Sequence, residues 1–249
     1  MELLIKLLNN MDTSTIEKNY NEFVEYIEKY ISEPRKEKLL AMYEAFSDKL
    51  CTAPASSHST RHNCFAGGYI DHVNRVVATA IELHKVWEKL AAPISDFTLE
   101  EVVFAALNHD LGKLGSSKEE YYVPNDQDWQ IKKGQIYKIN PSLHFMKVPD
   151  RSIYLLQEFG IEMSESEYLA IKLHDGLYGK GNESYLMPGI TEFSLKTNLP
   201  ILIHHADHLA TLIESKGHFE SAAPKKKIAQ VNDPVADANL KNIFDNMFN

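Results

Sequence analysis

Cysteine is scarce in this sequence, and its placement excludes two common kinds of small motif. Cys51 and Cys64 are the two cysteines among 249 residues. They do not form a CxxC pair, so neither a zinc ribbon nor a thioredoxin-like site is supported. A disulfide between them stays open at this stage. We favour two free thiols in a reducing cytoplasm.

Long hydrophobic runs are also missing. The apolar N-terminal stretch from Met1 to Leu8 is interrupted by Lys6 and is far shorter than the ~20 residues of a membrane-spanning helix. It also lacks the small-residue cleavage site of a signal peptide. We therefore expect a cytoplasmic protein without a membrane partner.

Positive charge is in short supply as well. The chain has 26 Lys and Arg against 35 Asp and Glu, a net charge of -9. Coating duplex nucleic acid requires clustered basic side chains, so this class of function is disfavoured. The run Lys225-Lys226-Lys227 is interpreted as a solvated charge cluster. A small nucleotide substrate remains compatible, because a few local cations or a metal can bind its phosphate.

What the sequence does contain is helical periodicity, with apolar residues three and four positions apart. Thr98 with Glu101, and Ser164 with Glu167, are typical of capping boxes at helix starts. The helix that begins at Thr98 is expected to end near Gly112 or Gly115. The other predicted helices cover residues 14–31, 34–50, 69–90, 149–159, 164–174, 198–216 and 236–248.

Residues 129–139 have a different pattern. Residues 129–131 and 135–139 alternate in polarity around Gly134, which predicts a short β-hairpin. The segment 175–196 is rich in glycine and is predicted to be a loop. The predicted fold class is therefore all-α, with one small β-hairpin inserted.

A pattern of histidine and aspartate carries the chemistry. His109 and Asp110 end an apolar helix, where burying such a pair is costly unless a metal or partner satisfies it. The string continues as Leu111-Gly112-Lys113. Further members are spread along the chain in a definite order: His72 before this string, then His144, His174 and Asp207 after it.

In this order the residues resemble the HD superfamily of metal-dependent phosphohydrolases, from residue 62 to about 214. The opening from His62 through Gly67-Gly68 to His72 is similar to the start of HD domains in YhaM-type exoribonucleases. The resemblance implies a helical bundle, the HD domain, over residues 61–216. A helical extension over 1–60 would precede it, and a tail over 217–249 would follow.

The resemblance also implies two divalent metal ions that share Asp110, with a water between them as the nucleophile. Mixed imidazole and carboxylate ligands suit Mn, Fe, Co, Ni or Zn, and Mg is a further candidate. The implied ligands of one ion are His72, His109, Asp110 and Asp207, and those of the other are Asp110, His144 and His174. If His144 were not a ligand, one ion would remain.

Several neighbours are candidates for substrate contacts or catalysis. Arg75 and Lys113 each follow a ligand by three residues on a helix, so both could reach a phosphate oxygen. A surface salt bridge for Arg75 and a helix-end charge for Lys113 are the alternatives. His62 could donate a proton to the leaving group or pack as a loop residue. For His174, a structural role at a helix C-terminus is the alternative.

The last predicted helix and the preceding loop supply further candidates. His204 precedes Asp207 by three residues and is predicted to support that carboxylate. His205 and His208 are predicted to face away from the site. Tyr178 and Lys180, on the loop, are predicted to contact substrate.

Three functions follow as hypotheses. The leading one is hydrolysis of a phosphoester in a nucleotide or a related small phosphate. The second is oxygen chemistry at two irons, as in a smaller branch of the HD superfamily. The third is a metal-stabilised helical domain that binds a nucleotide without catalysis.

Overall fold

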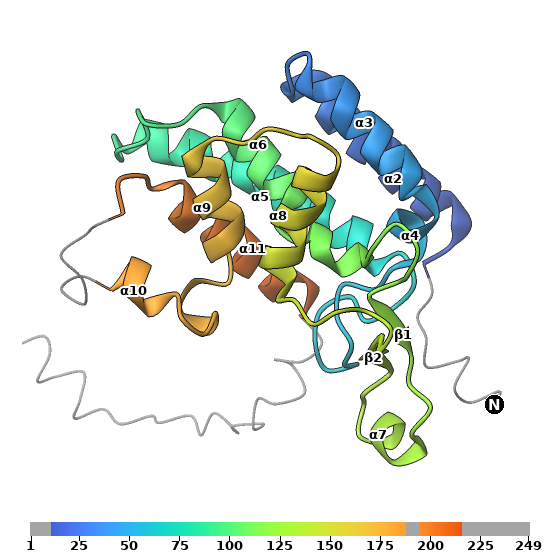
Figure 1. The fold of residues 1–249 in the computed structure, drawn as a ribbon. Coiled ribbons are helices and arrows are strands. Elements are labelled where there is room, and N and C mark those ends of the chain that lie inside the picture. The colour runs from blue at the N-terminus through green and yellow to red at the C-terminus, as the bar shows by residue number, and fades with distance from the viewer. Residues whose placement is uncertain (1–10, 188–194, 216–249) are drawn as a thin grey trace, which may run out of the picture. The chain divides into compact units, whose positions relative to one another are not determined.

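The computed structural model describes residues 11–187 and 195–215, and this part of the chain is mostly helical. Ten α-helices occur there, with two short 3-10 helices and one two-stranded sheet (Figure 1). In chain order they are α2 (Thr13–Tyr30), α3 (Arg35–Ala45), α4 (Ser47–Thr52), α5 (Gly68–Lys89), α6 (Leu99–Asn108), η1 (Leu111–Leu114), β1 (Tyr122–Pro124), α7 (Asp128–Lys132), β2 (Tyr137–Ile139), α8 (Val148–Glu158), α9 (Glu165–Leu173), η2 (Gly176–Tyr178), α10 (Glu183–Leu186) and α11 (Leu199–Glu214).

The predicted helix starts are confirmed at their caps. Thr98 accepts a hydrogen bond from the backbone N–H of Glu101, and the Glu101 side chain accepts one from the backbone of Thr98. Ser164 begins α9 in the same reciprocal way. The helix expected over 34–50 is instead two helices that meet at Phe46. The backbone at Phe46 leaves the helical conformation (φ -105°, ψ 9°), and its buried ring packs 5.8 Å from the ring of Phe159.

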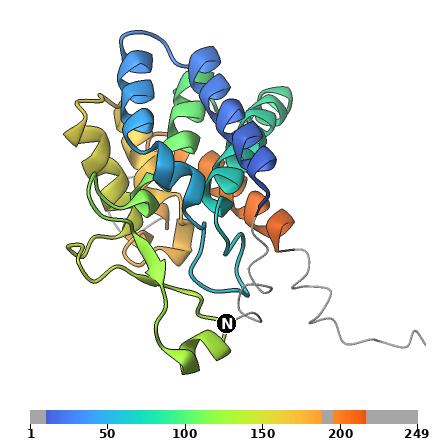
Figure 2. The same cartoon turned by 90° about the vertical axis from the view of Figure 1, so that its right-hand side faces the viewer.

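The helices that carry the histidines and aspartates pack on one another. Helix α11 contacts α5 and α9, α5 contacts α6, and α6 contacts α9. Helix α8 packs on α9 and on η1. Helix α2 covers α5 and α6, and α3 runs beside it along one edge of the bundle (Figures 1 and 2). Segments far apart in the sequence therefore meet within one core.

The small hairpin is confirmed, but its first strand differs from the prediction. Strand β1 pairs antiparallel with β2, and residues 128–132, where the first strand was expected, form helix α7. Backbone N–H groups of Gln130 and Ile131 donate to the carbonyl of Gln127, which starts that turn. Local hydrogen bonding therefore overrides the alternating pattern. In Figure 1 the strands and α7 extend away from the helices.

Backbone hydrogen bonds join this insertion to the loop before α5. The carbonyl of Ser57 accepts from the N–H groups of Ile136 and Tyr137, at 3.0 and 3.1 Å. The N–H of Ser59 donates to the carbonyl of Gly134 at 2.8 Å. The loop 53–67 is thereby held against the insertion.

One buried ion pair links the N-terminal helices to the rest of the bundle. Arg35 donates from Nη1 to both carboxylate oxygens of Glu167, at 2.7 and 2.9 Å, and from Nη2 to Glu100 at 2.6 Å. Arg35→Met would leave the fully buried Glu167 without its cation, so we expect the free energy of unfolding to fall by about 2–4 kcal/mol. Urea denaturation measures this. Lys36→Met, which removes an exposed pair with Glu33, should cost under about 1 kcal/mol. Equal losses in the two variants would contradict the expectation.

Among the described helices, none has the length and apolar character needed to cross a bilayer. The predicted helix 236–248 and the cluster Lys225-Lys226-Lys227 lie outside the described residues.

Candidate metal centre

Five of the six predicted ligands converge in the bundle core. They come from four helical segments: His72 from α5, His109 and Asp110 from the end of α6, His174 from the end of α9, and Asp207 from α11. The His72 Nε2 atom lies 3.2 Å from Asp207 Oδ1 and 3.7 Å from Asp110 Oδ2. The Nε2 atoms of His109 and His174 lie 3.4 and 3.6 Å from the Asp110 carboxylate.

Two helix ends orient two of these imidazoles in the same way. His109 and His174 each follow the last residue of a helix, and each hydrogen-bonds through Nδ1 to the carbonyl three residues earlier. The Nδ1–O distances are 2.7 Å to Ala106 and 2.9 Å to Ile171. Because a carbonyl only accepts, a proton is on Nδ1, and in the neutral ring Nε2 keeps the lone pair that can bind a metal. Both Nε2 atoms lie near Asp110.

His72 is oriented by a residue that the sequence pattern did not single out. Its Nδ1 lies 3.0 Å from the nearer carboxylate oxygen of Glu214, the last residue of α11. Glu214 also accepts from Arg75 Nε at 3.0 Å, and Arg75 pairs with Asp71 at 3.0 Å. Glu214 follows Asp207 by seven residues, two helical turns along the same face, and this spacing could have indicated it.

This network accounts for Arg75, which was predicted to contact substrate. Its guanidinium is held by two carboxylates, and it is not among the residues that line the adjacent cavity. Its position therefore agrees with the alternative interpretation, in which Arg75 forms a salt bridge and does not contact substrate.

The donor atoms fit a metal ion. The Nε2 atoms of His72 and His109 are buried and make no hydrogen bond within the described part of the chain. Two ligand atoms that each lie ~2.1 Å from one ion are separated by about 3.0–3.5 Å, close to the 3.2–3.7 Å measured here. His72, His109 and Asp110 could therefore hold a metal ion. A second group, His62 with His72 and Glu214, could also hold one. We favour the first group, because Nδ1 of His72 is already bonded to Glu214.

Burial and charge act together in the cluster. Burial opposes the charged form of His72, yet the carboxylates of Asp207 and Glu214 raise its pKa to about 10. Burial likewise opposes the ionised form of Asp110, but Lys113, whose Nζ lies 2.6 Å away, holds the pKa of that carboxyl well below its usual range. Burial and the neighbouring His72 lower the pKa of His62 to about 3. The Asp110 carboxyl group is thus held in its ionised form, which suits it to bind a cation.

The sixth predicted ligand, His144, is not brought to the cluster. It lies between β2 and α8 in an exposed segment, next to Phe145, which is 90% exposed. Its backbone carbonyl accepts a hydrogen bond from Arg151, and it is not among the cavity-lining residues. The hairpin insertion precedes it, so the chain reaches α8 over the surface rather than through the core.

Helix α11 places two of its other histidines, His204 and His208, differently from the prediction, whereas His205 faces away from the cavity as predicted. The Nδ1 of His204 lies 2.8 Å from the carbonyl oxygen of His174, so it supports that residue rather than the Asp207 carboxylate. Gly176 (φ +56°) leaves room for this ring, since a Cβ there would lie 2.5 Å from His204 Cε1. His208 was predicted to face away but lines the cavity, nearly parallel to the ring of Tyr178.

A cavity of about 590 Å³ adjoins the cluster, within the 300–1,000 Å³ typical of ligand sites. Asp110, His174 and Asp207 line it on the side of the ligands. The predicted residues His62, Lys113, Tyr178 and Lys180 line it as well.

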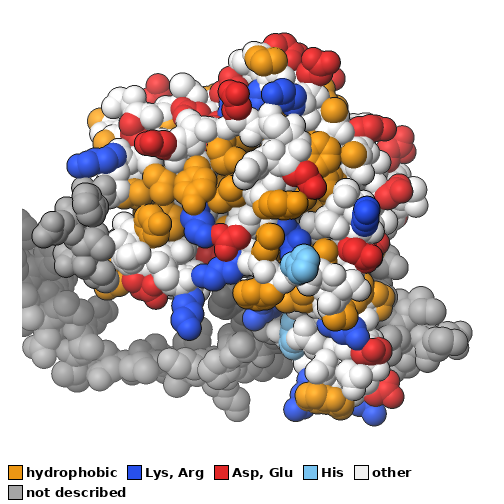
Figure 3. All heavy atoms as spheres, viewed as in Figure 1, with side chains coloured by type: hydrophobic (Ala, Val, Ile, Leu, Met, Phe, Trp, Pro, Cys, Tyr) orange, Lys and Arg blue, Asp and Glu red, His pale blue; other side chains and the backbone are white. Residues whose placement is uncertain are grey.

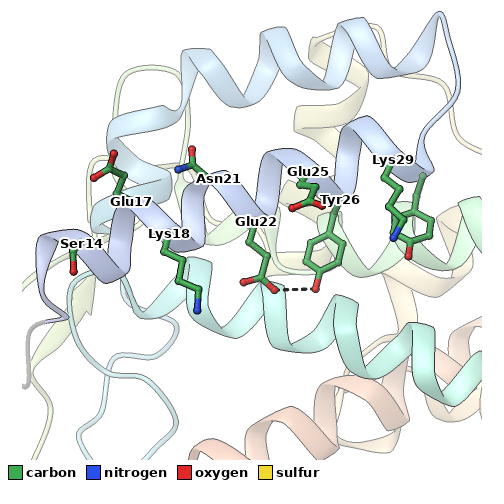
Figure 4. Close-up of a pocket in the computed structure, with 9 residues that line it drawn as sticks. Ser14, Glu17, Lys18, Asn21, Glu22, Glu25, Tyr26 and Lys29 are labelled. Carbon is green, nitrogen blue, oxygen red and sulfur yellow. Dashed lines mark hydrogen bonds between the residues drawn. The ribbon is translucent and has the colours of Figure 1, made fainter.

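A second hollow, of about 620 Å³, runs along the exposed face of α2 (Figure 4). Its lining side chains all come from residues 14–30 and include neither a histidine nor a buried polar atom without a partner. The buried histidine–aspartate cluster lies elsewhere, so we place the candidate site at the cavity beside Asp110.

No family model, curated protein or solved structure matches the chain. The site is accordingly defined by its geometry and by the order of its residues.

Replacing Glu214 tests the centre without touching a ligand. Glu214→Gln removes the negative charge that orients and polarises His72, and we expect metal affinity to fall about 10- to 100-fold. Calorimetric titration of the metal-free protein with Mn²⁺ or Co²⁺ measures this. Asp71→Asn is the matched control, because Asp71 shares Arg75 but does not contact His72. An unchanged affinity in Glu214→Gln would show that this carboxylate does not orient a ligand.

Proposed function

We propose that this chain is a metal-dependent phosphohydrolase of the HD type, acting on a phosphoester of a nucleotide or a related small phosphate. The observation that supports it is a buried histidine–aspartate cluster beside a cavity lined by basic side chains; among the described residues, Nε2 of His72 and of His109 has no hydrogen-bond partner. The chain as a whole is acidic, with a net charge of -9, so this concentration of cations is local.

The described ligands favour one well-built ion site. His72, His109, Asp110 and Asp207 would hold the ion. His174, beside the other oxygen of Asp110, could contribute to a second ion, but the predicted partner His144 is exposed elsewhere. When bound, such an ion supplies an acidified water and polarises a phosphoryl oxygen.

The openness of the cluster favours catalysis over a purely structural role. The side chains of His72 and His109 are fully buried, whereas 19% of the Asp207 side chain is exposed and both aspartates line the cavity. Structural metal sites are closed by protein ligands, and catalytic ones keep a position for water or substrate. One side of this centre is therefore accessible to a substrate.

Two cavity residues would act on the substrate directly. The Lys113 ammonium lies beside Asp110 and is nearly buried, so it can bind a phosphoryl oxygen placed at the same carboxylate. The His62 ring lies 4.6 Å from that of His72 and its Nε2 has no hydrogen-bond partner in the described part of the chain. It is placed to hydrogen-bond a substrate oxygen or a water next to the centre.

The test combines metal content with turnover. The purified protein is analysed for bound metal, reconstituted with Mn, Fe, Co, Ni or Mg, and assayed on phosphomonoesters, phosphodiesters and nucleoside triphosphates. We expect turnover that a chelator abolishes and that added metal restores. Metal binding without turnover on any phosphoester would favour the non-catalytic domain. Turnover that requires both iron and oxygen would favour the oxygenase.

A further inference from the structure

More Lys and Arg side chains line the cavity than the nearby carboxylates neutralise. Five cations line it, and they come from several segments: Arg61, Lys113, Lys147, Lys172 and Lys180. Lys113 pairs with Asp110, and Lys172 pairs with Asp150. Arg61, Lys147 and Lys180 have no carboxylate partner among the described residues. We call these three the unpaired rim.

Backbone contacts position the unpaired rim. Lys147 is the N-cap residue of α8, and its Nζ donates to the carbonyl of Lys180 at 2.6 Å, which joins α8 to the loop after η2. Arg61 belongs to the loop 53–67, which backbone hydrogen bonds hold to the hairpin insertion. In Figure 3, Lys and Arg side chains gather around the lower ends of α8 and α9. These cations are thus brought to one opening by the fold.

An aromatic pair lies at the same opening. The Tyr178 side chain is 81% exposed although it lines the cavity. Its ring is nearly parallel to that of His208, with an interplanar angle of 21° and 6.2 Å between centroids. Exposed aromatic rings of this kind are platforms for stacking a flat heterocycle, worth about 1–3 kcal/mol for a nucleic-acid base.

From these features we infer that the ligand is a nucleoside 5′-polyphosphate, with two or more phosphates, rather than a monophosphate; this rests on the proposed function. A divalent ion and Lys113 together carry a charge of +3, of which Asp110 and Asp207 offset two, so a single phosphate with a charge of about -2 would draw on about one further cation. Most of the unpaired rim would be left unused. A triphosphate extends past the centre, so its further phosphates bind Arg61, Lys147 and Lys180 while the base stacks on Tyr178.

The experiment is direct binding, which does not depend on turnover. Metal-loaded protein at one fixed free Mn²⁺ concentration is titrated with four probes: a methylene-bridged nucleoside triphosphate, the nucleoside monophosphate, inorganic tripolyphosphate and the nucleoside. We expect the triphosphate analogue to bind at least about tenfold tighter than the monophosphate. Tripolyphosphate should share most of that advantage, and the nucleoside alone should bind weakly.

Variants distinguish the contribution of the unpaired rim to binding from that of the aromatic pair Tyr178 and His208. The combined variant Arg61→Gln, Lys147→Gln, Lys180→Gln should lose the tenfold advantage, because it weakens binding of the triphosphate analogue far more than binding of the monophosphate. Tyr178→Ala should weaken the nucleoside triphosphate but not tripolyphosphate. Lys85→Gln is the matched control, because Lys85 is an exposed lysine on α5 paired with Glu82. It should change neither affinity.

Two results would overturn the inference. One is equal affinity for mono- and triphosphate in the wild-type protein. The other is an undiminished triphosphate advantage in the combined variant. Turnover of monophosphates alongside either result would leave the proposed phosphohydrolase standing and remove only the polyphosphate class. Failure of every phosphate probe to bind would count against both.

Discussion

Asp110→Asn is expected to abolish metal binding and to lower phosphoester turnover by about 1,000-fold or more. The carboxylate of Asp110 lies within 3.4–3.7 Å of the Nε2 atoms of His72, His109 and His174, so it is the residue that all three imidazoles share. An amide offers one oxygen and no negative charge. Elemental analysis and turnover under metal saturation measure the two losses.

The control is Asp175→Asn, an equal change of charge at a half-exposed residue that lines the same cavity. It should keep its metal. Asp110→Asn also leaves Lys113 without its counter-ion and can destabilise the fold, so thermal unfolding of the metal-free variant is recorded alongside. His109→Gln provides a second route, because it removes one imidazole and keeps the Asp110–Lys113 pair. Full metal content in both ligand variants would refute the assignment of the centre.

Gly112→Ala should destabilise the protein by about 3 kcal/mol, the upper part of the range for overpacking. A Cβ at Gly112 would lie 2.3 Å from the carbonyl oxygen of Val148 and 3.0 Å from the Cβ of Arg151. The backbone of η1 approaches α8 closely here: the Gly112 N–H donates to Ser152 Oγ at 2.8 Å, and Ser152 Oγ lies 3.1 Å from the carbonyl oxygen of His109. Because the clash is with backbone, side-chain rotation cannot relieve it.

Gly160→Ala is the informative comparison. Gly160 has φ +62°, but no described atom lies within 4 Å of the position that a Cβ would take, so only backbone strain of about 1 kcal/mol is expected. Chemical denaturation of both variants separates packing from conformation. Since η1 directly follows Asp110, Gly112→Ala should also reduce metal content. A cost no larger than that of Gly160→Ala would mean that α8 can move away without penalty.

The same glycine shows what periodicity can and cannot predict. The sequence indicated Gly112 or Gly115 as a helix end, and α6 in fact ends earlier, at Asn108. Gly115 does have a positive φ (+89°), which favours glycine, whereas Gly112 is required by the close approach of α8. Local signals such as the Thr98 capping box were sufficient to locate helix starts. These local signals could not predict contacts between distant segments, such as the packing of Phe46 on Phe159.

The residues of the candidate site likewise fall into those that the sequence could predict and those that it could not. His72, His109, Asp110, His174 and Asp207 could be selected because they stand in one recognisable order on predicted helices. Glu214 was missed, since its role depends on α11 lying against α5. His144 was selected on order alone, and the insertion before it takes it to the surface. Order along the chain thus predicts which side chains meet in the core where helix geometry sets their direction, and fails for His144, which lies in a loop.

The hydrogen bonds between the hairpin insertion and the loop 53–67 have a consequence for how this site could diversify. They run from backbone to backbone, at Ser57, Ser59 and Gly134 with their partners, and so do not depend on which side chains the two segments carry. Tyr122 and Arg61 project from these segments to the cavity. One wall of the candidate site can therefore accept new side chains through single substitutions that leave its position and the candidate metal ligands unchanged. If the proposed function holds, such substitutions would alter substrate preference.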